Sequence, residues 1–107
     1  MHRKFISIPA LDAVPKIKHA FTTRHDGLGA RNSGFKSPDD WNAVADAFGI
    51  LPDRVVTVQQ VHGDDIIVVN GNNFQDMRLR QADGLVTAAP GIAIGVETAD
   101  CVPVLLY

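Results

Sequence analysis

Residues 54–69 read RVVTVQQVHGDDIIVV, and this stretch indicates how the chain is built. Two runs rich in β-branched residues, 54–61 and 66–69, are interrupted by Gly63, at which the backbone can turn sharply. Such runs, bounded by turn residues, predict short β-strands. We therefore expect a strand over 54–61, a turn that carries His62, and a second strand over 66–69, with a further turn at 70–73 (NGNN).

Similar short apolar runs lie on both sides of this stretch. Residues 84–88 and 92–97 flank Pro90-Gly91, which predicts a hairpin turn between two strands. Residues 102–106 predict a last apolar strand. Toward the N-terminus, 5–8 and 17–23 predict two more strands, separated by a link that contains proline.

One helix is well marked, over residues 39–48. Its start has a capping hydroxyl, a proline suited to the first turn and two acids that favour the positive helix end: Ser37, Pro38, Asp39 and Asp40. Apolar side chains follow at helical spacing and form a core-facing stripe: Trp41, Val44, Ala45 and Phe48. Gly49 supplies a C-terminal stop. The chain is therefore expected to be α+β, with a mostly β second half.

Composition narrows the class of protein. At 107 residues, 46% hydrophobic and 21% charged, the chain has the size of one globular domain or a piece of one. Ten basic and twelve acidic residues give a net charge of −2 without a basic run, which argues against a nucleic-acid partner. No apolar segment approaches the ~20 residues that span a membrane, and no signal peptide is evident. We expect a cytoplasmic protein.

His62 is the histidine best placed to carry chemistry. It ends a predicted strand beside Gly63, a position from which a side chain can face a cleft. The plainer interpretation is a partly exposed histidine at a turn.

Cys101 is the only cysteine, and it lies beside Asp100 in an apolar run. Neighbouring side chains of an extended chain point to opposite faces. Either Asp100 faces solvent and Cys101 is a buried structural thiol, or the backbone is irregular and both groups line a pocket. Pro103 removes a hydrogen-bond donor and is consistent with a break in regular pairing.

Other charged residues give weaker signals. Arg24 closes a predicted strand and leads into a glycine-containing loop, where its donors could hold a phosphate or carboxylate. Asp83 and Glu97 lie at strand ends, where most acids are simply solvated.

Four short motifs occur in one order: 21–24 (FTTR), 60–63 (QVHG), 82–87 (ADGLVT) and 98–104 (TADCVPV). Together they resemble the laccase-domain family, the YfiH-like proteins once described as multicopper polyphenol oxidases, of the purine nucleoside phosphorylase type. The resemblance runs from about residue 18 to residue 107. It implies an α+β fold with a layered mixed β-sheet core and flanking helices, related to a group of cysteine hydrolases.

The resemblance also implies a zinc site made by a histidine, a cysteine and a second histidine. His62 and Cys101 correspond to the first two ligands, which would place the imidazole and the thiol about 3–4 Å apart. The second histidine of the family lies in a His-Ala-Gly-Trp-Arg-Gly motif that does not occur in this sequence. Residues 1–107 are therefore expected to be the N-terminal portion of a single laccase-type domain.

By the same resemblance, Asp100 and Arg24 are the expected catalytic residues, and Arg24 and Gln60 are expected to bind substrate. The loop after Arg24 departs from the family pattern, which has a Gly-Gly pair and then Ser-Leu-Asn-Leu-Gly.

The activity implied is that of a zinc-dependent enzyme of purine nucleosides. Family members are associated with phosphorolysis of adenosine, inosine or methylthioadenosine and with adenosine deamination, so the expected partners are a nucleoside and phosphate, with a homodimer possible. Zinc held by three ligands leaves one position open, where water can act as a nucleophile near neutral pH.

Several alternatives stay open. Cys101 and His62 could form a metal-free hydrolase dyad, or the protein could edit peptidoglycan precursors. The fragment alone could be inactive. A copper oxidase is disfavoured, because a blue-copper centre with a trinuclear cluster needs about ten histidines and this chain has four.

Overall fold

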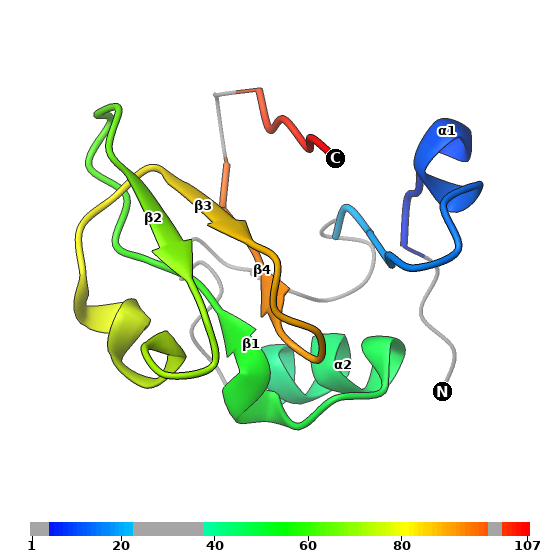
Figure 1. Cartoon of the computed structure of the whole chain (residues 1–107), viewed down its shortest axis with the longest axis horizontal. Coiled ribbons are helices and arrows are strands. Elements are labelled where there is room, and N and C mark those ends of the chain that lie inside the picture. Colours follow the sequence, from blue (N-terminus) through cyan, green and yellow to red (C-terminus); the bar gives the residue numbers. More distant parts are fainter. Residues whose placement is uncertain (1–4, 23–37, 99–101) are drawn as a thin grey trace.

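In the described part of the chain, three short helices come first, followed by two short strands, a further helix and two more strands (Figure 1). A computed structural model describes residues 5–22, 38–98 and 102–107. Its elements are α1 (Pro9–Asp12), α2 (Pro38–Phe48), the 3-10 helix η2 (Pro52–Arg54), β1 (Val55–Val56), β2 (Ile66–Val69), the 3-10 helix η3 (Phe74–Leu79), β3 (Gly84–Thr87) and β4 (Ala93–Ile94). The described part of the chain is thus α+β, as the sequence predicts.

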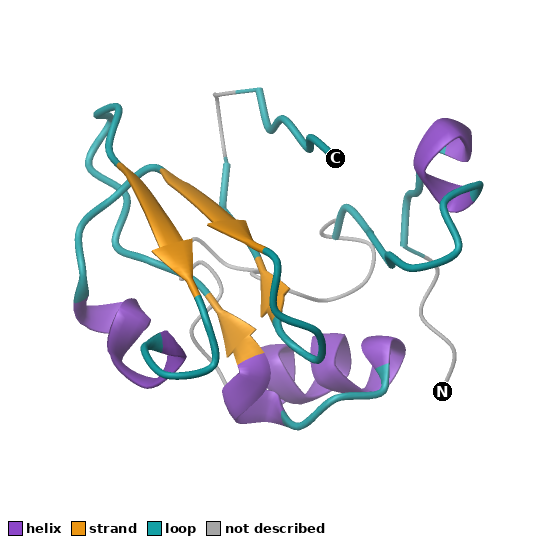
Figure 2. Ribbon diagram, viewed as in Figure 1, coloured by secondary structure: helices purple, strands orange, loops and turns teal. Residues whose placement is uncertain are grey.

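The described strands form two parallel pairs (Figure 2). β1 pairs with β4, and β2 pairs with β3 in a register that sets Ile66 opposite Gly84 and Val69 opposite Thr87. A parallel pair needs a long crossover, and residues 70–83, which contain η3, provide it between β2 and β3.

The predicted hairpin at Pro90-Gly91 is wrong. A turn is present, with Gly91 at φ 75°. However, β3 and β4 each pair with a different, earlier strand and not with each other. The turn residues fix the local change of direction, whereas the strand partners are chosen by the rest of the chain.

Two predicted strands are confirmed and two are shorter than expected. β2 has the predicted bounds, and β3 ends one residue early at Thr87. Of residues 54–61, only Val55–Val56 form a strand, because η2 leads directly into it and Gln59 joins Gln81 by an isolated bridge. Of residues 92–97, only Ala93–Ile94 form a strand, and they pair with the two residues of β1.

At the two ends of the chain the strand predictions fail. Between 5–8 and 17–22, one antiparallel bridge joins Ile6 to Phe21, and α1 forms where only a link was expected, with Pro9 at its first turn. Residues 102–107 have no regular structure. Their apolar composition favours a strand, but a strand needs a hydrogen-bonded neighbour, and most of these side chains stay exposed.

The predicted helix is confirmed. α2 begins one residue earlier than expected, at Pro38, and ends at Phe48. Ala45 is fully buried, and Trp41, Val44 and Phe48 are half-buried, so the predicted stripe faces the protein. No helix in the described part of the chain is long and apolar enough to cross a membrane.

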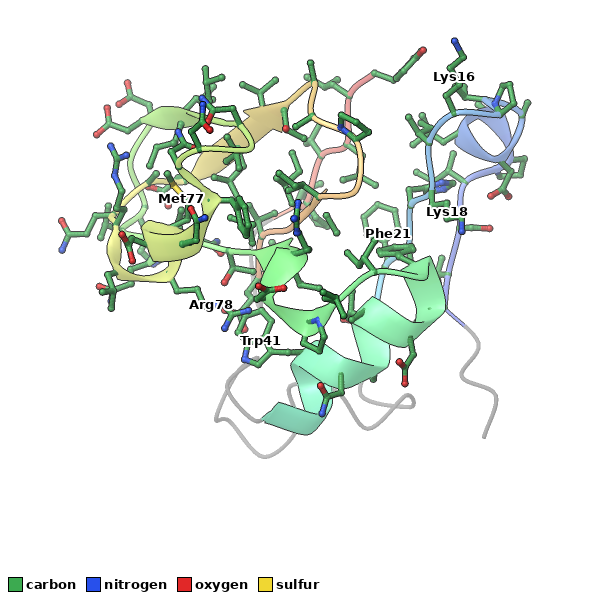
Figure 3. All side chains as sticks on the ribbon, turned by 60° about the horizontal axis from the view of Figure 1, so that its bottom comes forward. Lys16, Lys18, Phe21, Trp41, Met77 and Arg78 are labelled. Carbon is green, nitrogen blue, oxygen red and sulfur yellow. The ribbon has the colours of Figure 1, made fainter. Side chains whose placement is uncertain are left out.

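Arg78 of η3 joins this helix to β1. Its guanidinium lies 3.9 Å from the centre of the Trp41 ring and donates to the carbonyl oxygens of Val55 (2.9 Å) and Pro52 (3.2 Å) (Figure 3). Burial lowers the pKa of Arg78, and the charge of Asp53 acts in the opposite direction. The planar guanidinium serves here as a structural connector.

The described core lies where the two strand pairs meet η3. Its buried members are Val56, Val58, Val69, Phe74, Met77 and Ala82, with Ile67, Leu85, Ile92 and Ile94 packed against them. The chain leaves this core after Val58 and enters the turn that carries His62. The turn is therefore anchored to a packed frame.

Candidate functional site

The turn that carries His62 runs beside residues 80–84. At its start, the Gln59 amide donates to the Arg80 carbonyl (2.8 Å), and the Ala82 amide donates to the Gln59 carbonyl (3.0 Å). At its end, the amides of Asp83 and Gly84 both donate to the Asp65 carbonyl, at 3.0 and 3.2 Å. Both ends of the loop are thus fixed to the segment that leads into β3.

The Asp83 carboxylate holds the middle of the same loop. Oδ1 accepts the backbone N–H groups of Val61 (3.1 Å) and His62 (3.0 Å), and Oδ2 accepts that of Gly63 (2.7 Å). Hydrogen bonds to an ionised acceptor are stronger than those between neutral groups. Asp83 is therefore part of the site, although the sequence alone suggested only a solvated acid. The available signal was its place before a glycine at a strand start.

His62 has an unusual backbone conformation. Its φ is +58°, and no other non-glycine residue in the described ranges has a positive φ. This left-handed conformation costs a residue with a side chain about 1–2 kcal/mol, so the surrounding bonds must hold it. The side chain is exposed. That exposure fits an imidazole available to a ligand, and it fits a plain turn histidine equally well.

Gln60 ties this turn to a distant segment. Its Nε2 donates to the Glu97 carbonyl (2.6 Å), and the Glu97 amide donates to its Oε1 (2.7 Å), so the side-chain amide pairs like a strand backbone. Glu97 stands four positions before Cys101 in the sequence. The contact therefore brings the turn next to the segment that leads to Asp100 and Cys101.

The predicted site residues divide into two groups. His62 and Gln60 are described, whereas Arg24, Asp100 and Cys101 lie outside the described residues. The approach of Cys101 to His62 stays a prediction. Within residues 5–22, 38–98 and 102–107, no three His, Cys, Asp or Glu side chains gather in a way that could hold a metal ion.

A cavity of about 280 Å³ lies elsewhere, near the N-terminal segment. It is lined by Phe5, Ser7, Asp12, Ile17, Lys18, His19, Ala20, Ala47 and Phe48, none of which is a predicted site residue. His19 has a structural role there. Its Nε2 accepts the Ile8 amide (2.7 Å), and Nδ1 lies 3.9 Å from Asp12.

We expect Gln60→Ala to loosen the contact with Glu97. Two hydrogen bonds of about 1 kcal/mol each would be lost, so hydrogen exchange at the Glu97 amide should speed up about tenfold or more. Gln59→Ala is the matched control, because Gln59 is exposed and makes its contacts here through its backbone. Equal exchange at Glu97 in the two variants would contradict the role assigned to Gln60.

Comparison with known proteins gives one family and several relatives. The family model described as "Multi-copper polyphenol oxidoreductase laccase" matches residues 18–107. A purine nucleoside phosphorylase of Streptomyces coelicolor is 40% identical over an alignment covering 89% of this chain and 44% of that protein. One from Mycobacterium tuberculosis is 41% identical, covering 85% and 40%, and one from Corynebacterium glutamicum is 35% identical, covering 84% and 42%.

The chain thus spans less than half the length of these curated relatives. No solved structure gave a significant match.

Proposed function

The chain belongs to the family described as multi-copper polyphenol oxidoreductase laccases, and we propose that the whole protein is a zinc-dependent enzyme acting on purine nucleosides. The relatives' names point to phosphorolysis rather than to phenol oxidation. We propose adenosine, inosine or methylthioadenosine as the nucleoside, with adenosine deamination as a secondary reaction.

The structure of the turn around His62 is the observation that links the proposal to particular residues. Its backbone is fixed by Asp83, its imidazole is exposed, and Gln60 ties it to Glu97. The chain from Glu97 to residue 101 can span at most about 14 Å. Cys101 is therefore within reach of this turn by chain length alone.

The donor set suits zinc. Imidazole nitrogen and thiolate sulfur are both common zinc ligands, and a catalytic site needs three protein ligands with one position open. His62 and Cys101 would supply two of these ligands. The histidine of the family's His-Ala-Gly-Trp-Arg-Gly motif, which lies outside this sequence, would supply the third. Bound there, zinc would supply a Lewis acid next to the nucleoside.

The other residues would bind substrate and move protons. In phosphorolysis, a phosphate oxygen forms a bond to C1′ of the ribose while the C1′–N9 bond breaks. The electron pair goes to the purine, which takes up a proton and leaves as the free base. Arg24 would hold the phosphate, and Asp100 would orient a ligand or transfer the proton. Gln60 contacts Glu97 here, and a direct contact with substrate stays a prediction.

The test uses a longer form of the protein, in which the chain continues through a segment with the family's His-Ala-Gly-Trp-Arg-Gly motif. Its zinc content and its release of free base are measured. His62→Ala and Cys101→Ala should each lower bound zinc well below one per chain and reduce phosphate-dependent release of hypoxanthine from inosine by about a thousandfold or more. His2→Ala serves as the matched control, since it removes a histidine at the N-terminus.

Different results would separate the alternatives. Turnover that survives a chelator but is lost in Cys101→Ala would indicate a metal-free Cys/His hydrolase instead. Full zinc content and turnover in both variants would overturn the site assignment.

A further inference from the structure

The Asp83 side chain takes part in the His62 turn without being one of the expected metal ligands. One carboxylate accepts three successive backbone N–H groups, those of Val61, His62 and Gly63. A single side chain thus accepts the donors of three successive residues in the turn.

We propose that Asp83 is a positioning residue, whose carboxylate holds His62 in its left-handed backbone conformation and so sets the direction of the imidazole. This inference rests on the proposed role of His62 as a ligand. The φ angle of a residue fixes the direction of its Cα–Cβ bond relative to the preceding chain, so a return to a negative φ would turn the ring away. A metal ligand must be held within about 0.5 Å of its productive position.

Asp83 is itself well anchored. Its amide donates to the Asp65 carbonyl, and the next residue, Gly84, begins β3 and pairs with Ile66 of β2. The C-terminal end of the loop therefore meets the start of the strand pair, directly beside the residue that carries the carboxylate.

The approach of the carboxylate to the loop is close and favours glycine at position 63. A Cβ added to Gly63 would lie 3.2 Å from Asp83 Oδ2, so the carboxylate would have to shift by a few tenths of an ångström. The small residue after His62 thus lets the carboxylate reach the third N–H group. The same carboxylate therefore contacts the left-handed His62 and the glycine that follows it.

The test compares Asp83→Asn with Asp64→Asn. The asparagine at position 83 keeps one acceptor oxygen, but its NH₂ group would replace the acceptor that faces the Gly63 N–H. Asp64 is exposed and lies in the same loop, so its substitution removes the same charge without removing the carboxylate that accepts the amides of residues 61–63.

We expect hydrogen exchange at the amides of residues 61–63 to speed up about tenfold or more in Asp83→Asn and to stay unchanged in Asp64→Asn. In the longer form, zinc affinity measured against a chromophoric chelator should fall about tenfold to a hundredfold in Asp83→Asn only, the range typical of residues that orient metal ligands. Both variants, measured alongside, should still unfold in one cooperative urea transition, which separates loosening of the turn in a folded chain from unfolding.

Unchanged amide exchange in Asp83→Asn would overturn the proposal, as would faster exchange with zinc affinity equal to that of Asp64→Asn. Failure of the proposed function is a separate result, namely an unsubstituted longer form that binds no zinc. The exchange measurement needs no metal, so the hold of Asp83 on the turn is decided in that case too.

Discussion

The 107-residue chain on its own is expected to bind zinc weakly and to release no free base from adenosine or inosine, whereas the longer form should do both. In the proposed site, His62 and Cys101 would supply two ligands where the family resemblance implies three. Structural four-ligand zinc sites are worth about 10–16 kcal/mol, so one ligand is worth on the order of 3 kcal/mol. Its loss should weaken zinc binding by more than about a hundredfold.

Apolar side chains that are exposed in the described part of the chain favour association of the isolated chain. Val102 and Leu106 are 83% and 91% exposed, and Ile66 and Val68 of β2 are 68% and 64% exposed. Exposed apolar surface of this kind marks a contact with other protein or a risk of aggregation. We expect the isolated chain to associate with further copies as its concentration rises.

Isothermal titration with zinc and a free-base assay on both forms check this prediction, and sedimentation at several concentrations checks the association. Stoichiometric zinc and full turnover from the isolated 107 residues, unaffected by Cys101→Ala, would refute both the need for a further segment and the assigned ligands.

The second large effect is on stability, and it is expected at Met77. This side chain is 1% exposed and lies in the core with Val56 and Val69. Met77→Ala removes buried apolar atoms and leaves a cavity, which costs about 2–5 kcal/mol of unfolding free energy. A loss of this size is a large fraction of the stability of a small domain.

Leu79→Ala provides the matched control in the same helix. Leu79 is in η3 like Met77 but is 76% exposed, so its substitution should change the unfolding free energy by less than about 0.5 kcal/mol. Urea unfolding followed by circular dichroism measures both. Equal losses in the two variants would mean that η3 does not pack as described.

The sequence by itself determined the elements that depend on neighbours in the chain. α2 follows from a proline start, an apolar stripe at helical spacing and Gly49 as a stop. β2 and β3 follow from β-branched runs bounded by turn residues. The family assignment likewise rests on short motifs, and the family model confirms it over residues 18–107. His62 stood out for the same local reason, a histidine beside glycine at a strand end.

Only the tertiary structure decided what those elements contact. Which strands pair, and therefore the failure of the hairpin at Pro90-Gly91, depends on partners far away in the chain. The same holds for the site, where Asp83 reaches His62 across 21 positions and Gln60 reaches Glu97 across 37. The physical reason is that the partners of these donors and acceptors lie far away in the sequence, so nothing in their local sequence identifies them. An aspartate at a strand start is a solvated acid or an anchor according to which backbone N–H groups the fold brings to it.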